Sequence, residues 1–165
     1  MSMTLGGTNP AVTFPDGTIQ NTAYIATGSV LQVVNATYST QVSTSANTFS
    51  DTGLTATITP KFSTSKILVL VDQNSVSKDT SNTGVNIKLQ RNGSDIGGYF
   101  GFVSGYTNST AASDIGSVSV NYLDSPATTS AVIYKTQFSS NSPTASAIVQ
   151  QFNAMSTITL MEIAG

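Results

Sequence analysis

The sequence predicts an all-β fold, and three observations lead to this prediction. Short runs in which apolar and polar residues alternate recur along the chain, and this is the period of a half-buried strand. Turn-forming residues such as Gly, Asn, Asp, Ser and Pro separate the runs. No segment repeats its apolar residues at helical spacing, so we expect very little helix. About eight to ten short strands of this kind indicate a sandwich, jelly roll or barrel.

The strand-like runs can be placed in order along the chain. In "TGLTATITP", Leu54, Ala56 and Ile58 share one face and threonines occupy the other. The run from Ile67 to Val71 is continuously apolar, which favours a strand buried on both faces or one at a subunit contact. The expected strand segments are 29–38, 52–60, 66–76, 85–100, 115–123, 130–138, 146–152 and 156–165.

Segment 85–100 predicts a β-hairpin. Apolar residues alternate along its first arm, Asn92-Gly93 supplies the turn, and the return arm runs through 96–100. The same alternation predicts two more sets of residues on the core face. These are Val118, Val120 and Tyr122 in segment 115–123, and Val132, Tyr134, Thr136 and Phe138 in segment 130–138.

The composition is polar but nearly uncharged. The 165 residues fit one ordinary domain, and only 8% of them are Asp, Glu, Lys or Arg, against about 25% in typical globular proteins. Ser and Thr together fill about 30% of positions. Hydroxyls and amides therefore solvate the surface, as in strand-rich proteins exposed to a harsh exterior. The alternative explanation is the ordinary preference of strands for Thr and other β-branched residues.

Composition also excludes several classes of function. The net charge is −2 and the six basic residues are scattered singly, so no basic patch for nucleic acid can form. The chain has no Cys and no His, which excludes disulfides, thiolate zinc sites and an imidazole base. No apolar run reaches the ~20 residues of a membrane span, so we expect no membrane insertion. The N-terminus lacks a signal-peptide pattern, so we expect synthesis in a cytoplasm without ordinary secretion.

The sequence predicts neither an enzyme nor a metal or cofactor site. Asp72 and Asp79 flank one loop and form the best glycosidase-like pair, but most Asp residues here stand in turn contexts. The chain contains no Gly-x-Ser-x-Gly elbow, and without His nothing activates a serine. Calcium ligation by Asp79, Asp95 or Asp114 is another alternative, but no loop carries the dense alternating oxygen ligands of a calcium motif.

Residues 1–28 are predicted to form an N-terminal attachment segment, or neck, and residues 29–165 a separate head domain. In "FPDGTIQNTA", the proline fixes φ and the Asp-Gly step supplies a tight turn between two apolar arms. Such a two-armed unit is too small to be stable alone, so we expect copies of itself or a partner to cover it. The alternative is an edge hairpin folded back on its own head. The neck residues are Val12, Phe14, Pro15, Asp16, Gly17 and Ile19.

The segment 14–23 resembles the "FPDGTxQxTA" element of fibre and appendage proteins from tailed bacteriophages, where it precedes or punctuates a β-rich head. The stretch 29–74 and the ending "STITLMEIAG" also look like phage virion proteins of this kind. The order of the strands resembles the trimeric jelly rolls of tumour-necrosis-factor and complement-type heads. These resemblances imply a jelly-roll-like antiparallel sandwich head, a homotrimer and a place on a virion surface.

Recognition, where it occurs, is expected in the polar loop within Gly98–Asp114. We expect Tyr99 or Phe100, together with Phe102, to alternate into the core and leave the end of the loop exposed. The polar segment Lys78–Asn82 is a second contributor. The candidate binding residues are Tyr106, Thr107, Asn108, Ser109 and Thr110.

These observations together predict a structural protein on a tailed-phage virion. The first hypothesis is a trimeric fibre or tail-tip head involved in host attachment, assembled in the cytoplasm of the host bacterium. The alternative is a trimeric capsid decoration protein, and a glycan hydrolase ranks last. The expected partners are other copies of the chain, other virion proteins bound through the N-terminal segment, and a host surface glycan or protein.

Overall fold

The computed structural model describes residues 4–5, 12–13, 15–20, 25–104, 106 and 116–165, and these residues confirm the all-β prediction. They form strands and a single 3-10 turn, η1, with no α-helix among them. None of the described segments has a helix of the length and apolar character that a bilayer span requires. The elements are β1 (Thr4–Leu5), β2 (Val12–Thr13), β3 (Ile19–Gln20), β4 (Val30–Tyr38), β5 (Val42–Thr44), β6 (Ser50–Ile58), β7 (Lys66–Gln73), β8 (Ser77–Lys78), β9 (Val85–Arg91), β10 (Ser94–Ser104), β11 (Val118–Asp124), β12 (Val132–Ser140), β13 (Ala147–Val149), η1 (Gln151–Asn153) and β14 (Ser156–Ile163).

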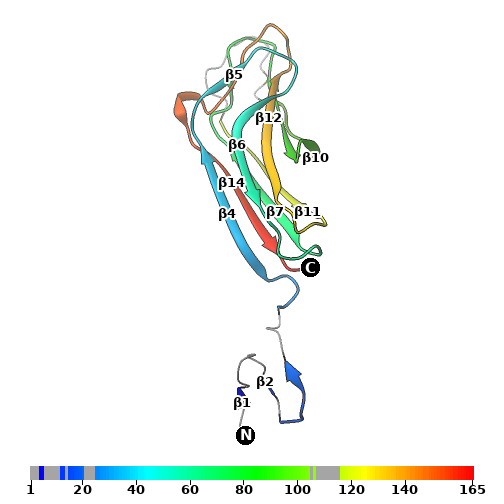
Figure 1. Ribbon diagram of the computed structural model, residues 1–165. Helices are drawn as coiled ribbons and strands as arrows, with labels where there is room; N and C mark the ends of the chain where they lie inside the picture. Colours follow the sequence, from blue (N-terminus) through cyan, green and yellow to red (C-terminus); the bar gives the residue numbers. More distant parts are fainter. Residues whose placement is uncertain (1–3, 6–11, 14, 21–24, 105, 107–115) are drawn as a thin grey trace.

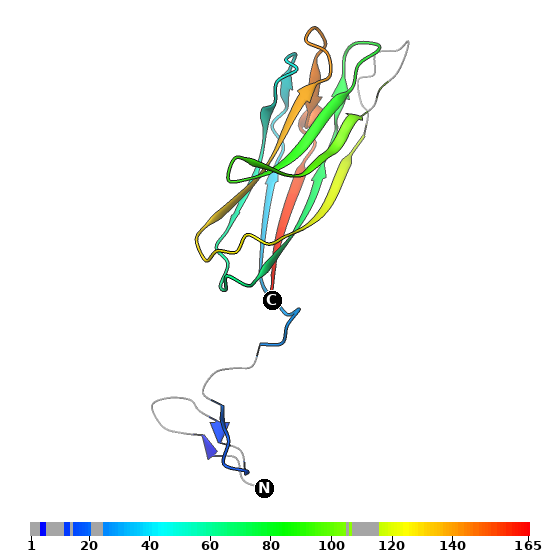
Figure 2. The same cartoon turned by 90° about the vertical axis from the view of Figure 1, so that its right-hand side faces the viewer.

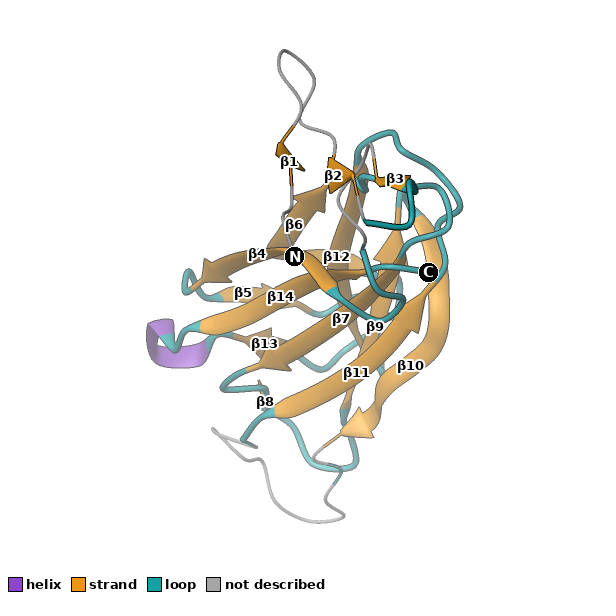
Figure 3. Ribbon diagram, turned by 90° about the horizontal axis from the view of Figure 1, so that it is seen from below, coloured by secondary structure: helices purple, strands orange, loops and turns teal. Residues whose placement is uncertain are grey.

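Eight long strands form two antiparallel sheets packed face to face (Figures 1 and 3). One sheet has the order β10-β9-β12-β6 and the other has the order β11-β7-β14-β4. Taken in chain order, the first long strand therefore pairs with the eighth, the second with the seventh, and the third with both the eighth and the sixth. This is the connectivity of a jelly roll, in which two Greek keys fold into a double sheet. The predicted sandwich head is confirmed.

The predicted hairpin and face assignments are also confirmed. Strands β9 and β10 pair across the turn, where Asn92 and Gly93 have positive φ angles of 48° and 82°. The core-facing residues predicted on β6 and β12 are buried, and those on β11 are half-buried against the core. On β7, Ile67 and Val71 are buried, whereas Leu68 on the opposite face is only half-buried. Within one chain, β7 therefore buries one face.

Segment 146–152 differs from the predicted strand. Only β13 is extended, and it joins β5 and β8 in a short sheet. Gln150 and Phe152 adopt φ angles of 50° and 58°, and this left-handed backbone turns the chain into η1 (purple in Figure 3). The alternation of side chains in segment 146–152 does not predict this bend, because none of the residue types there requires a positive φ.

A polar layer divides the core into two apolar clusters. The hydroxyls of Thr52 and Thr136 lie 2.6 Å apart, and Thr136 Oγ1 donates to Gln73 Oε1 at 3.0 Å. Gln73 Nε2 in turn donates to Ser156 Oγ at 3.0 Å. All four residues are buried, and they link β6 and β12 of one sheet to β7 and β14 of the other. A satisfied network of this kind fixes how the two sheets face each other.

An ion pair joins the two sheets at one end of the sandwich. Arg91 Nη1 on β9 lies 2.8 Å from Asp124 Oδ1 on β11, and the Tyr134 hydroxyl donates to Asp124 Oδ2 at 2.7 Å. Burial, together with this hydrogen bond to a carboxylate, raises the pKa of Tyr134. Tyr134 therefore remains a neutral donor that holds Asp124 against β12.

The N-terminal strands form a small sheet of their own, β1-β2-β3. Strands β2 and β3 pair antiparallel around the turn at 15–17, which confirms the hairpin-like unit. Asp16 Oδ1 accepts hydrogen bonds from the amide and hydroxyl of Thr18, and this lowers the pKa of Asp16. Figures 1 and 2 show this sheet outside the sandwich, beyond the end at which the C-terminus lies. Its strands do not pair with head strands, unlike the edge hairpin that the sequence left as an alternative.

Candidate functional site

The outer face of sheet β10-β9-β12-β6 carries two matching Lys-x-Gln steps. Lys88 and Gln90 lie on the outer face of β9, and Lys135 and Gln137 lie on the outer face of β12, because alternate residues of a strand share a face. Neighbouring side chains cover Gln90 almost completely, and the Lys88 side chain is 13% exposed. In the antiparallel register Lys88 stands opposite Gln137 and Gln90 opposite Lys135. The four side chains therefore form a block with approximate twofold symmetry at the centre of the sheet.

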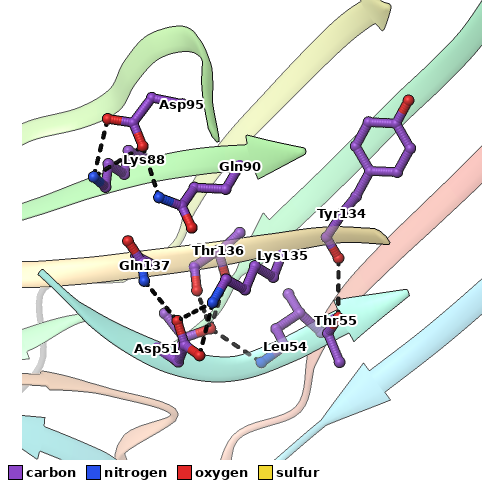
Figure 4. Close-up of polar contacts among 11 residues, drawn as sticks. Asp51, Leu54, Thr55, Lys88, Gln90, Asp95, Tyr134, Lys135, Thr136 and Gln137 are labelled. Carbon is purple, nitrogen blue, oxygen red and sulfur yellow. Dashed lines mark hydrogen bonds and ion pairs between the residues drawn. The ribbon is translucent and has the colours of Figure 1, made fainter. Parts of the chain in front are cut away.

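Each Lys-Gln pair binds one aspartate on the neighbouring outer strand (Figure 4). Asp95 on β10 accepts from Lys88 Nζ at 3.0 Å and from Gln90 Nε2 at 2.7 Å. Asp51 on β6 accepts from Lys135 Nζ at 2.8 Å and from Gln137 Nε2 at 2.7 Å. We call these six side chains the Lys-Gln face.

Both carboxylates of the Lys-Gln face are held ionised. The hydrogen bond from Lys135 lowers the pKa of Asp51, although partial burial opposes this, and Gln137 adds to the lowering. Hydrogen bonds from Gln90 and then Lys88 lower the pKa of Asp95. A glycosidase needs one carboxyl whose pKa is raised so that it can donate a proton. Neither carboxyl meets this requirement, and the two lysines balance both charges.

A cluster of three aromatic side chains adjoins the Lys-Gln face. The Phe49 and Tyr99 rings are stacked, with centroids 5.5 Å apart and planes at 14°. Phe102 lies next to Tyr99, at 5.6 Å between centroids. Lys88 Nζ lies 4.2 Å from the Phe49 centroid, a cation–π contact that ties the aromatic cluster to the Lys-Gln face. Tyr99 also stands directly opposite Lys88 in the β-ladder.

The exposure of Phe102 corrects the sequence prediction, since 69% of this residue is exposed. The expectation that either Tyr99 or Phe100 faces the core is met by Phe100, and Tyr99 is 53% exposed. The register of β10 against β9 shifts three times between Ile96 and Ser104, and Gly97 and Gly98 have positive φ. Each shift changes which residues face outward, so simple alternation fails in this strand.

A bulge in β6 forms a hollow at the Asp51 end of the Lys-Gln face. Lys135 pairs with Thr55 and Gln137 with Asp51, so β6 inserts extra residues around Gly53, whose φ is 88°. The hollow has a volume of about 150 Å³. It is lined by Asp51, Gly53, Leu54, Thr55, Lys135 and Thr136.

The predicted binding loop is only partly described. Tyr106 is half-exposed; its hydroxyl donates to Asn82 Oδ1 at 3.5 Å, and its ring centroid lies 6.0 Å from Lys78 Nζ. Tyr106 therefore lies beside the segment Lys78–Asn82 that the sequence associated with it. Thr107, Asn108, Ser109 and Thr110 lie outside the described residues, as does Phe14 of the neck.

Three of the carboxylates considered as a catalytic pair or as calcium ligands, Asp72, Asp79 and Asp95, serve as local hydrogen-bond acceptors, and Asp114 lies outside the described residues. Asp72 accepts from Ser119 Oγ at 2.9 Å on the outer face of the other sheet. Asp79 accepts from the Ser146 amide at 2.9 Å and from Thr80 Oγ1 at 2.8 Å. In the described part of the chain, no three acidic side chains gather closely enough to hold a metal ion.

The Lys-Gln face was missed in the sequence, although a signal for it exists. "KLQ" at 88–90 and "KTQ" at 135–137 place one cation and one amide on the same face of two predicted strands. In a chain with so few charged residues, two such repeats on neighbouring strands indicate a polar surface that can bind a partner. No protein-family model matches the sequence, and a comparison with curated proteins gives no significant match.

Proposed function

We propose that this chain is a virion surface protein of a tailed phage, a trimeric fibre or tail-tip head that binds the host. The observation that carries the proposal is the exposed aromatic cluster beside the Lys-Gln face. Exposed rings next to charged and amide groups form a recognition surface, and a rigid sheet presents this one. The pKa of both carboxylates is lowered, so neither is prepared to donate a proton, and this favours binding over hydrolysis at this surface.

The trimer has support from the opposite side of the sandwich. On the outer face of sheet β11-β7-β14-β4, the register aligns four apolar side chains directly across all four strands. The two outer members are half-exposed, at 50% for Leu123 and 55% for Val33. Three copies around an axis would remove this surface from water. We call these four residues the apolar row: Leu123, Leu68, Met161 and Val33.

The N-terminal sheet provides the attachment to the rest of the particle. Ile19 is exposed there, and a three-stranded sheet of two-residue strands has too little surface to be stable alone. A partner protein or neighbouring copies cover it, in keeping with the resemblance of residues 14–23 to phage fibre elements. Replacing Ile19 by Asp in the full chain should reduce incorporation into particles without changing the thermal midpoint of the head.

Immunogold labelling of purified particles tests the proposed location. Gold at the tail tip or on fibres is the expected result. Regular labelling over the head would show a decoration protein instead, and unlabelled particles would contradict a virion role altogether. A companion assay adds excess purified protein to host cells, where a receptor-binding head should block adsorption of the phage.

A further inference from the structure

The Lys-Gln face and the aromatic cluster form one continuous surface, and from their chemistry we infer that this surface binds a neutral oligosaccharide. The inference rests on the proposed function, and it names the class of host ligand and the residues that contact it. These residues lie outside the loop around Tyr106 where the sequence placed recognition.

The aromatic cluster supplies the apolar half of the recognition. A pyranose ring has one face rich in C–H groups, which packs flat against an aromatic ring. Tyr99 and Phe102 expose such rings, and the stack with Phe49 fixes the Tyr99 ring in place before any ligand arrives. A ring that is already held loses little conformational freedom on binding, so more of the contact energy remains as affinity.

The Lys-Gln face supplies the polar half. Sugar hydroxyls act as donor and acceptor at once, and they pair well with a carboxylate that lies next to an ammonium or an amide group. Asp95 and Asp51 remain more than half exposed at their side chains, so each carboxylate can accept bonds beyond those from its lysine and glutamine. Asp95 lies on β10 and Asp51 on β6, so one such carboxylate lies near each edge of the sheet.

The charge balance of the surface selects an uncharged ligand. Two lysines offset two aspartates, and each cation lies within 3.0 Å of its anion. An acidic saccharide would have to compete with Asp51 and Asp95 for the same ammonium groups, and a cationic one would compete with the lysines. A neutral saccharide bonds to both without breaking either pair.

The dimensions of the surface favour several sugar units. From β10 to β6 the sheet is about 14 Å wide, since neighbouring strands lie about 4.8 Å apart. Tyr99 and Phe102 of the aromatic cluster lie on β10, whereas the hollow lies between β12 and β6. A 150 Å³ space holds a six-membered ring. A ligand that stacks on Tyr99 and also fills the hollow must therefore be an oligosaccharide.

Isothermal titration calorimetry with defined trisaccharides tests this inference. The probes are cellotriose, maltotriose and galactotriose, with trigalacturonic acid as the acidic counterpart of galactotriose. We expect the full chain to bind at least one neutral probe, and to bind trigalacturonic acid at least about tenfold more weakly than galactotriose. Phe102→Ala should weaken the neutral complex at least about tenfold, and Asp51→Asn should weaken it several-fold. Phe152→Ala removes an equally exposed ring on η1 and should leave binding unchanged.

Three results would overturn the inference. One is no heat of binding with any neutral probe at millimolar concentration, and another is tighter binding of the acidic probe. The third is parent-like sugar affinity in Phe102→Ala. If Phe102→Ala abolishes binding to host cells although no sugar binds, the partner is a protein; the saccharide inference then fails while the attachment function stands. Thermal midpoints of all three variants should match the parent, because these side chains are exposed.

Discussion

The two sheets of the sandwich share one core but have opposite outer surfaces. The sheet β10-β9-β12-β6 carries two of the three ion pairs found among the described residues, together with three clustered aromatic rings. The sheet β11-β7-β14-β4 carries the apolar row. Inward-facing side chains on both sheets are alike, since they pack into the same two clusters. The requirement to fold explains the residue types on the inner faces only. The residue types on the outer faces therefore indicate what each surface contacts.

The low charge content of the chain makes the difference between the two outer faces easy to recognise. With so few charged residues, most of the surface is neutral, and a group of two lysines and two aspartates on one face stands out. The apolar row needs no such pairs, because a matching surface of another copy covers it in the proposed trimer. In the proposed function, one sheet therefore faces the host ligand and the other faces neighbouring copies of the chain.

The largest effect should come from placing charge in the apolar row. Replacing Leu123 and Val33 by Asp together should convert the proposed trimer to a monomer, because desolvating carboxylates at an apolar contact costs several kcal/mol. Light scattering with far-ultraviolet circular dichroism measures mass and fold in one sample. Ile133→Asp makes the same chemical change at a half-exposed site on the opposite sheet and should leave the mass unchanged. If the parent chain is already a monomer at micromolar concentration, the apolar row does not form a trimer contact.

The next effect concerns the bulge that shapes the Lys-Gln face. Gly53→Ala should destabilise the head by about 3 kcal/mol, because φ is 88° and the new Cβ would lie 2.3 Å from the Tyr38 ring. Gly93→Ala is the matched control, since φ there is 82° but no atom lies within 4 Å of the added Cβ. We expect it to cost about 1 kcal/mol. Chemical denaturation measures both, and equal losses would mean that the contact with Tyr38 is unimportant.

A smaller effect compares one charge on each sheet. Glu162 at the end of β14 is buried; its carboxylate accepts from Gln32 Nε2 at 2.5 Å and from the Lys61 amide at 2.6 Å. Burial alone would raise the pKa of Glu162, but the hydrogen bonds from Gln32 and from the Lys61 amide favour the ionised form, and the pKa is lowered. We expect Glu162→Gln to cost about 2 kcal/mol at neutral pH, and Asp95→Asn, which is exposed, less than about 0.5 kcal/mol.

The pH dependence of stability follows from the direction of the Glu162 shift. Because its pKa in the folded protein lies below its ordinary value, the stabilisation is complete above about pH 4.5 and is lost as pH falls through the folded pKa. The parent should therefore lose stability in acid more steeply than Glu162→Gln below about pH 4.5. If the curves of thermal midpoint against pH are parallel for the parent and Glu162→Gln, groups other than Glu162 cause the loss of stability in acid.

The sequence predicted the fold well because strand alternation is a local property. Val132, Tyr134, Thr136 and Phe138 face the core as the period of two requires. The site was not predicted, because bulges override that period. The register shifts after Ile96 turn Tyr99 and Phe102 outward. Gly97 and Gly98 within the strand are a signal for a bulge, but they do not show which side chains a bulge turns outward. The similarity of "KLQ" to "KTQ" can be recognised in the sequence. That the two segments lie side by side follows only from the pairing of β9 with β12, which the sequence alone does not show.

Binding of labelled protein to host cells tests the central claim most directly, namely that the aromatic cluster and the Lys-Gln face form the recognition surface. The comparison uses the parent, Phe102→Ala and Phe152→Ala at equal concentration, with the thermal midpoint of each measured alongside. We predict saturable binding of the parent and of Phe152→Ala, and at least about tenfold weaker binding of Phe102→Ala at an unchanged midpoint. Equal binding by all three proteins would contradict the claim and favour recognition by the loop around Tyr106.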